Sequence, residues 1–250
     1  KVAPKDKVVV VGGGNVAMDC ARTCLRLGFK KVNILYRRSR AEMPAIDEEI
    51  EEAEREGVTF EFLATPAEVL TKNGKVSEVK CIRMKLGKPD ASGRKRPILV
   101  EGSEFVVKTD MVIAAIGEQP ELPFLKEEAL STKEGLLKVD PDTLETPLAG
   151  VFAGGDAITG PDTVVKALAA GKRAAVNIDK YLKGKTLEKS KPGARVKKED
   201  RVWWKELPKA ERPKMPELPV TERALNFNET KLGLSRELAL AEAKRRLGCK

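Results

Sequence analysis

The chain contains no histidine, and among its 250 residues there are only two tryptophans and two tyrosines. Without histidine, Ser–His and Cys–His nucleophile pairs, histidine general bases and histidine metal ligands are excluded. The few aromatic side chains leave little surface for stacking bases, which disfavours a nucleic-acid platform. Four cysteines are too few for a disulfide scaffold and favour a reducing compartment.

Long apolar runs are also absent. No segment approaches the ~18 apolar residues of a membrane span, and the first seven residues lack the apolar core of a signal peptide. We therefore expect a soluble, cytoplasmic protein with no membrane partner. The formal net charge is +9, but residues 183–250 carry 19 basic and 10 acidic residues and so hold the whole surplus. The body of the protein is charge-balanced, and the basic tail is expected to meet an acidic redox partner or a neighbouring domain.

In the first 62 residues, strand-like apolar runs alternate with segments of helical periodicity. Val8–Val11 is a β-branched run typical of a strand buried on both faces, and a helical pattern follows it and ends at Gly28. Residues 31–36 predict a second strand, and an acidic helix ending at Gly57 leads to a third strand at 58–62. This order predicts an α/β fold, a Rossmann-like doubly wound parallel sheet.

The pattern then changes. Residues 76–86 and 96–107 alternate apolar and polar side chains, which predicts an antiparallel β-meander, and residues 111–116 predict a return to the buried sheet. A short strand at 151–153 and a helix at 162–182 follow. We expect three parts: a nucleotide-binding domain at 1–116, part of a second domain at 117–182, and a basic connector at 183–250 that ends in a helix at 235–247.

The turn Gly12-x-Gly14-x-x-Ala17 lies between the first strand and the first helix. In a dinucleotide fingerprint the first glycine allows the tight turn, and the second lets the backbone approach a pyrophosphate. The third position lets strand and helix pack closely, and the anion sits on the helix N-terminus. The alternative is a tight turn without a ligand.

Arginines occupy the end of the second strand. An NAD site usually has an acidic residue there for the ribose hydroxyls, but Arg37, Arg38 and Arg40 stand in that region, with no acid before Glu42. Guanidinium groups suit a 2′-phosphate, so NADPH is favoured over NADH. The alternative is a solvated basic loop that offsets the acidic helix after it.

A second glycine-rich turn runs from Gly150 to Asp156, and Thr163 stands near the start of the following helix. These residues could bind the hydroxyl groups or the phosphate of a cofactor, and the helix N-terminus favours negative charge on a bound ligand. An ordinary strand-to-helix turn with a capping aspartate explains them equally well. Cys20 and Cys24, four residues apart on a helix, form no Cys-x-x-Cys pair and are expected to be core residues.

Several of these motifs, in this order, resemble the glutamate synthase small-subunit family of FAD/NAD(P)-dependent oxidoreductases. The resemblance rests on the runs Val8–Arg22, Tyr36–Ala45, Ala115–Pro120, Gly150–Asp156 and Gly160–Gly171. It implies hydride transfer from NADPH to FAD, with electrons passing on to iron–sulfur clusters or a redox partner. No acid–base side chain is required, because the cofactors carry the chemistry.

The motifs and the resemblance together define one set of candidate cofactor-binding residues. They are Gly12, Gly13, Gly14, Asn15, Val16, Ala17, Arg37, Arg38, Arg40, Ile116, Gly117, Gly155, Asp156, Thr163 and Val164. In this family an FAD glycine fingerprint precedes the NADPH insert, and only six residues precede the first strand here. We therefore expect a piece of a longer protein with an incomplete FAD site, colourless by itself; the alternative is that another chain supplies the missing half.

The last residues resemble the lead-in of an iron–sulfur domain that accompanies this family. The resemblance implies that Cys249 is one ligand of a 4Fe–4S cluster in the full-length protein. The alternative is an ordinary terminal thiol. A different class of function also fits the sequence: a nucleotide-sensing module whose basic tail docks on a partner.

Overall fold

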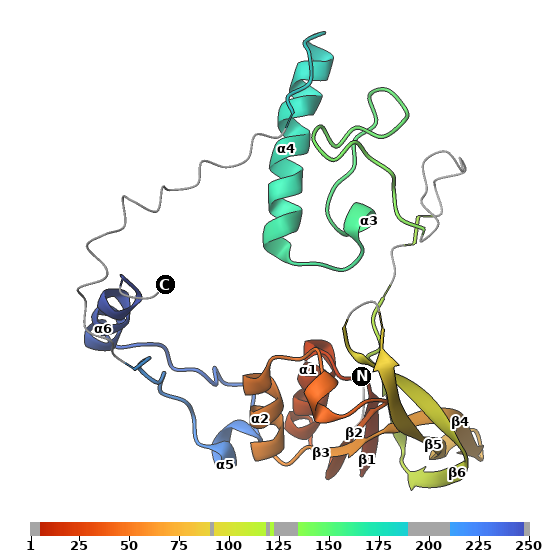
Figure 1. Cartoon of the computed structure of the whole chain (residues 1–250). Coiled ribbons are helices and arrows are strands. Elements are labelled where there is room, and N and C mark those ends of the chain that lie inside the picture. Colours follow the sequence, from red (N-terminus) through yellow and green to blue (C-terminus); the bar gives the residue numbers. More distant parts are fainter. Residues whose placement is uncertain (1–5, 91–92, 119–120, 123–134, 190–210, 248–250) are drawn as a thin grey trace. The chain divides into compact units, whose positions relative to one another are not determined.

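A computed structural model describes residues 6–90, 93–118, 121–122, 135–189 and 211–247. These residues form two compact units. One extends to Ile116 and includes the C-terminal segment, and the other begins at Gly117 (Figure 1). Within the described ranges, no helix combines the length and the apolar character needed to cross a membrane.

Four parallel strands form the central sheet of the first unit, in the order β3–β2–β1–β7. Their bounds are Thr59–Phe62, Lys31–Tyr36, Lys7–Val11 and Met111–Ala114. β1 lies between two neighbours, and Val8, Val9 and Val10 are at most 2% exposed. Burial of each such side chain contributes roughly 1.5–3 kcal/mol, which explains why this run is purely apolar.

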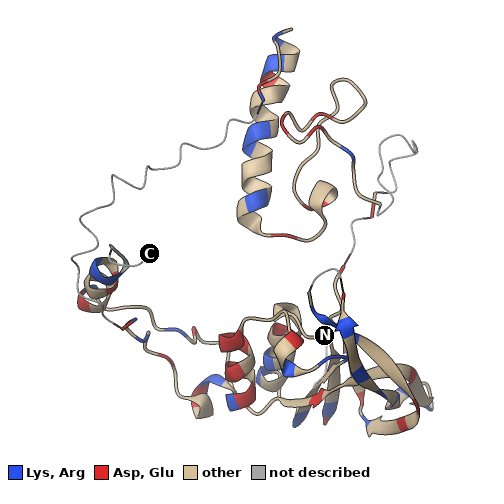
Figure 2. Cartoon of the chain, in the orientation of Figure 1, with Lys and Arg blue, Asp and Glu red and all other residues tan. Residues whose placement is uncertain are grey.

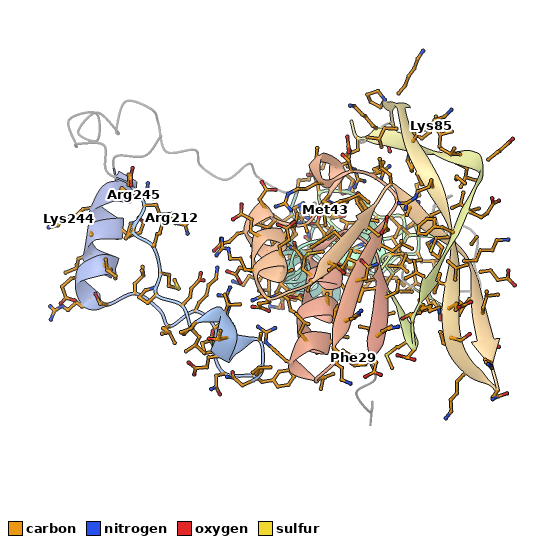
Figure 3. All side chains as sticks on the ribbon, turned by 90° about the horizontal axis from the view of Figure 1, so that it is seen from below. Phe29, Met43, Lys85, Arg212, Lys244 and Arg245 are labelled. Carbon is orange, nitrogen blue, oxygen red and sulfur yellow. The ribbon has the colours of Figure 1, made fainter. Side chains whose placement is uncertain are left out.

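The sheet is covered on both faces. Helices α1 (Asn15–Arg26) and α2 (Asp47–Arg55) cover one face, where Val8 and Val10 join the larger core cluster. Figure 3 shows Phe29 and Met43, which pack in this cluster, at two ends of the helical layer. Val9 belongs to a second core cluster, on the face that the antiparallel meander covers.

The meander consists of β4 (Ala64–Lys72), β5 (Lys75–Pro89) and β6 (Lys95–Lys108), paired in that order. β5 and β6 match the predicted hairpin, and β4 is an additional strand. Val79 and Cys81 on β5 are fully buried against the sheet. The predicted combination of a parallel sheet and an antiparallel meander is therefore confirmed.

The second unit contains the short helix α3 (Asp156–Thr159) and the long helix α4 (Val164–Leu182). α4 begins close to the predicted helix start, because Thr163 caps it by accepting from the Lys166 amide. The prediction of a strand at 151–153 is wrong, because in the described part of this unit Phe152 makes only an isolated bridge to Glu145. α4 exposes apolar side chains, with Val164, Val165 and Leu182 each more than 70% exposed.

The described part of the basic tail contains α5 (Val220–Arg223) and α6 (Arg236–Leu247). Ser235 caps α6, as predicted, by accepting from the Leu238 amide, and Figure 3 shows Lys244 and Arg245 on this helix. Before α6 the chain doubles back, and Glu217 pairs with Lys231 in an isolated bridge. We call residues 211–232 the strap.

The strap is joined to acidic α2. Arg223 is 1% exposed, and its Nε lies 3.1 Å from Glu56 Oε1. Lys231 pairs with Glu48 and lies 3.6 Å from Glu52. Figure 2 shows the concentration of acidic residues on α2 that these cations meet. The acidic surface contacted by this part of the tail thus belongs to the chain's own first unit.

Candidate functional site

The glycine turn connects β1 to α1, and its three glycines have different reasons to be glycine. Gly12 has φ +148°, and a Cβ there would lie 2.2 Å from the carbonyl oxygen of Ala115. A Cβ at Gly13 would lie 2.5 Å from the ring of Tyr36. The fold itself therefore requires glycine at both positions.

Gly14 has no such requirement. The nearest atom to a Cβ built there is Cγ of Pro44, at 3.9 Å, and the residue has extended backbone that any amino acid adopts. Ala17, the next position of the motif, lies on α1 and is fully buried. A glycine where the protein leaves room for a side chain is what close approach of a ligand would require.

The N-terminus of α1 is uncapped. Gly14 occupies the N-cap position without a side-chain hydrogen bond, and the first turn contains no acidic residue. Asn15 and Val16 at this turn are exposed. Free backbone N–H groups at such an end, together with the helix dipole, favour an anion.

The loop from Tyr36 to Ile46 lies against this turn and is tied to it by two hydrogen bonds. The Ala45 amide donates to the Gly13 carbonyl at 3.1 Å, and the Ile46 amide donates to Asn15 Oδ1 at 2.9 Å. Tyr36 closes the loop on itself, because its hydroxyl donates to the Glu42 carbonyl at 2.7 Å. Asn15 thus has a structural contact that the sequence did not predict.

The three predicted arginines have different surroundings. Arg37 is exposed, and no described residue engages its side chain. Arg38 is buried; its Nε donates to the Lys95 carbonyl at 2.8 Å, and its Nη2 pairs with Asp90 at 2.7 Å. Arg40 pairs with Glu54 on α2, and both side chains are about 40% exposed. The structure therefore brings all three to one loop but leaves Arg37 free.

In the second unit, two of the predicted residues border a cavity of about 430 Å³. Gly155 and Asp156 line it, together with Lys166 and Arg173 from α4. Gly155 has φ +67°, which favours glycine. Nε of Arg173 is buried and has no hydrogen-bond partner in the described structure.

Thr163, Val164, Ile116 and Gly117 are not among the residues that line this cavity. Asp156 Oδ1 accepts from the Asp162 amide at 3.3 Å, a contact between α3 and the turn before α4 that caps neither helix. Thr163 caps α4, and Val164 beside it is exposed. Ile116 and Gly117, which end the first unit and begin the second, are also exposed.

The described cysteines do not form a redox pair. Cys20, Cys24 and Cys81 are free thiols. Burial raises the pKa of all three, and that of Cys81 rises to about 11. Such thiols are poor nucleophiles, as expected for core residues. Cys249, the predicted cluster ligand, lies outside the described residues.

A buried ion network on α1 and α2 was not anticipated from the sequence. Glu56 has a fully buried carboxylate, which accepts from Arg22 and Arg26 of α1 at 2.9–3.1 Å. Burial alone raises the pKa of Glu56, but hydrogen bonds from the two arginines and their charges outweigh it, so the net pKa is lowered. Arg22 also pairs with Glu49 and Glu52.

The network already engages the acidic residues that are close enough to bind a metal ion. Glu48, Glu52 and Glu217 have carboxylate oxygens within 4.8 Å of one another. Lys231 pairs with the first two, and Arg223 pairs with Glu217 at 2.8 Å. The spacing of Arg22 and Arg26 on one face of α1 was the available signal for this network.

Comparison with known proteins identifies the family of the chain. Residues 1–171 match the family described as pyridine nucleotide-disulphide oxidoreductase, and the chain belongs to that family. The fold is also found in thioredoxin reductase of Lactococcus lactis (TM-score 0.59, 20% identity, 71% of this chain and 53% of that one). FprA of Mycobacterium tuberculosis in complex with NADPH is comparable (TM-score 0.56, 18% identity, 73% and 54%).

Curated relatives are more similar in sequence. NADP(+)-dependent formate dehydrogenase subunit beta of Moorella thermoacetica is 44% identical over 97% of this chain and 35% of its own length. NADPH-Fe(3+) oxidoreductase subunit beta of Geobacter sulfurreducens is 43% identical over 97% and 41%. The glutamate synthase [NADPH] small chain of Azospirillum brasilense is 46% identical over 71% and 37%. The predicted family resemblance is confirmed, and the chain spans less than half the length of these relatives.

Proposed function

We propose that this chain is the NADPH-binding part, and a portion of the FAD-binding part, of an NAD(P)H-dependent flavin oxidoreductase. NADPH binds the turn at Gly12–Ala17 and the loop that begins at Arg37. The overall reaction transfers hydride from NADPH to FAD, and electrons then pass to iron–sulfur clusters or a redox partner protein. The relatives named above are subunits of NADP-linked electron-transfer enzymes, which supports this class of reaction.

The observation that carries the proposal is Gly14. The protein leaves space for a side chain there, beside an uncapped helix N-terminus that the Tyr36–Ile46 loop adjoins. A ligand that brings its pyrophosphate against this backbone explains the glycine, and nothing else in the described structure does.

The cavity of the second unit fits a portion of an FAD site. Gly155 and Asp156 in its lining would hold the cofactor, with Thr163 at the start of α4, and Arg173 presents a buried Nε without a partner in the described structure at the cavity wall. FAD supplies the hydride acceptor when it is bound. An iron–sulfur cluster with Cys249 as a ligand, and a cytoplasmic location, remain predictions.

Substitution Gly14→Ala tests the proposal. The added methyl group has room in the protein, so the melting temperature should stay within ~2 °C of wild type. It would push the pyrophosphate away from the helix N-terminus, and charged hydrogen bonds are worth about 1.5–3 kcal/mol. We expect the Kd for NADPH, measured by isothermal titration calorimetry, to rise at least roughly tenfold.

Gly171→Ala on α4 is the matched control, because a Cβ there meets no atom within 4 Å and one at Gly14 meets none closer than 3.9 Å. It should leave NADPH binding by the first unit unchanged. The proposal fails if wild-type protein does not bind NADPH, or if Gly14→Ala binds it as tightly as wild type does.

A further inference from the structure

Helices α1 and α2 lie side by side and are joined at both ends. At their N-terminal ends, the Ile46 amide donates to Asn15 Oδ1 at 2.9 Å. At their C-terminal ends, Glu56 accepts from Arg22 and Arg26 at 2.9–3.1 Å. The proposed nucleotide turn lies at the first of these joints, and the buried carboxylate forms the second.

The strap contacts the helix pair at the second joint. Oε1 of Glu56 accepts from Arg22 Nη2 at 2.9 Å and from Arg26 Nη2 at 3.0 Å. Nε of Arg223 lies 3.1 Å from the same oxygen. The Arg223 side chain is 1% exposed, and its Nη1 donates to Glu217 of the strap itself at 2.8 Å. One buried oxygen thus ties the tail to α1 as well as to α2.

The joint at Glu56 affects the direction of α1. This helix is an unbroken element of 12 residues, so a shift of its last turn moves its first turn as well. The first turn carries the free N–H groups on which the proposed pyrophosphate site depends, and a hydrogen bond weakens steeply with misalignment. Loss of Arg223 from the joint would therefore change the nucleotide site although no strap residue touches it.

The strap also supplies cations that balance the charge of α2. Lys231 pairs with Glu48, and its Nζ lies 3.6 Å from Oε1 of Glu52. Glu52 is 1% exposed, and this oxygen has no hydrogen-bond partner in the described structure. The two glutamates are i,i+4 neighbours, and like charges at this spacing destabilise a helix. A strap that leaves α2 would therefore leave unbalanced carboxylates on the helix that adjoins the proposed site of an anionic nucleotide.

We propose that docking of the strap on α2 and binding of NADPH at the Gly12–Ala17 turn are coupled, and that Arg223 is the positioning residue through which they are coupled. The inference rests on the proposed NADPH function and adds regulation of that site by the C-terminal tail. Whatever draws the strap off α2 lowers the affinity for NADPH. Coupling between two sites is reciprocal, so bound NADPH in turn holds the strap on α2.

The first test measures hydrogen exchange in the intact wild-type chain and needs no substitution. The Leu218 and Leu232 amides donate to the Thr230 and Pro216 carbonyls within the strap. Saturating NADPH should slow their exchange by about fivefold, the lower end of typical coupling between sites. A purely structural role of the strap would not make these amides respond to a ligand at α1, so equal exchange with and without NADPH overturns the inference.

The second test measures the Kd for NADPH by isothermal titration calorimetry. Arg223→Met should raise it by about the same fivefold and should remove the effect of NADPH on strap exchange. Lys231→Met is the milder variant, because this lysine side chain is 34% exposed, and it should raise the Kd about twofold. Arg236→Met is the charge-matched control, since Arg236 is an exposed residue of the same tail that begins α6 outside the strap. It should leave the Kd unchanged.

Two results of the second test would also overturn the inference. One is that Arg223→Met binds NADPH as tightly as wild type does, and the other is that Arg236→Met weakens binding as much as Arg223→Met. A wild-type chain that does not bind NADPH contradicts the proposed function instead. Tight binding of NADPH with no response of the strap contradicts the coupling and leaves the proposed function intact.

Discussion

Replacement of Glu56 by glutamine is the sharpest test of how the first unit is held together. The carboxylate is 0% exposed and lies among Arg22, Arg26 and Arg223, whose side chains are 12%, 9% and 1% exposed. Glutamine has nearly the same shape but no charge. The substitution therefore removes the anion that three largely buried guanidinium groups share; Arg22 and Arg223 keep other carboxylates, whereas Arg26 loses the carboxylate it pairs with in the described structure.

The expected loss is large compared with the stability of a domain. Removal of one partner from a buried ion pair costs about 3–5 kcal/mol, because the remaining charge stays desolvated. Total unfolding free energies are roughly 5–15 kcal/mol. At about 2–4 °C per kcal/mol for a chain of this size, the melting temperature should fall by roughly 6–20 °C.

The measurement should report on the first unit specifically, since the second unit can unfold separately. Hydrogen exchange detected by mass spectrometry on peptides from α1 and α2, across a urea series, meets this need. The matched control is Glu51→Gln. Glu51 is on the same helix, but its side chain is 53% exposed in an i,i+4 pair with Arg55, so its loss should cost below about 0.5 kcal/mol.

Equal stabilities of Glu56→Gln and Glu51→Gln would refute the reasoning, because they would show that burial of this network contributes nothing beyond a surface pair. A large loss that persists unchanged when all three arginines are also replaced by methionine would refute it too. In that case the cost would come from the shape of residue 56 and not from uncompensated charge.

Three further predictions follow from the same structure. Arg223→Met should free the strap, seen as faster exchange of the Leu218 and Leu232 amides, which now donate to Thr230 and Pro216; unchanged exchange would mean that Lys231 alone suffices. Because the folded pKa of Glu56 is lowered, its contribution is present above the unfolded pKa of about 4.3 and is lost as pH falls below it. The stability gap between wild type and Glu56→Gln should therefore close in acid, and a gap independent of pH would contradict this. Gly13→Ala should destabilise the first unit by more than Gly14→Ala does, because only the former meets the Tyr36 ring, and equal melting temperatures would contradict it.

The sequence predicted those parts of the fold that local pattern determines. The run at Val8–Val11 predicted a strand buried on both faces, and the structure has β1 there. The glycines at 28 and 57 predicted the ends of α1 and α2 to within two residues. β4 has no comparable signal, because Pro66 interrupts it and its side chains are mostly half-buried or exposed. Its place is set by pairing with β5, a contact that local pattern does not reveal.

For the candidate site, the sequence predicted which segments take part but not the contacts of each side chain. The glycine turn and the basic loop follow from residue type and spacing, since each role needs a particular side chain at a particular distance from a strand end. Which arginine is free is decided by Asp90 and Lys95, more than 50 residues along the chain. Pairing at that separation depends on the folded meander, so the sequence alone treated Arg37 and Arg38 as equals.

Helix α2 contacts both the strap of the basic tail and the Tyr36–Ile46 loop. Its first residues follow the loop that is tied to Asn15, and Glu54 farther along holds Arg40 of that loop. Its other acidic residues hold Lys231 and Arg223 of the strap. A helix with so many carboxylates would repel itself without these cations, because like charges at i,i+4 are destabilising. The strap therefore neutralises the helix that adjoins the Tyr36–Ile46 loop. For this reason, loss of the strap should weaken NADPH binding through α2, although no strap residue is proposed to touch the nucleotide.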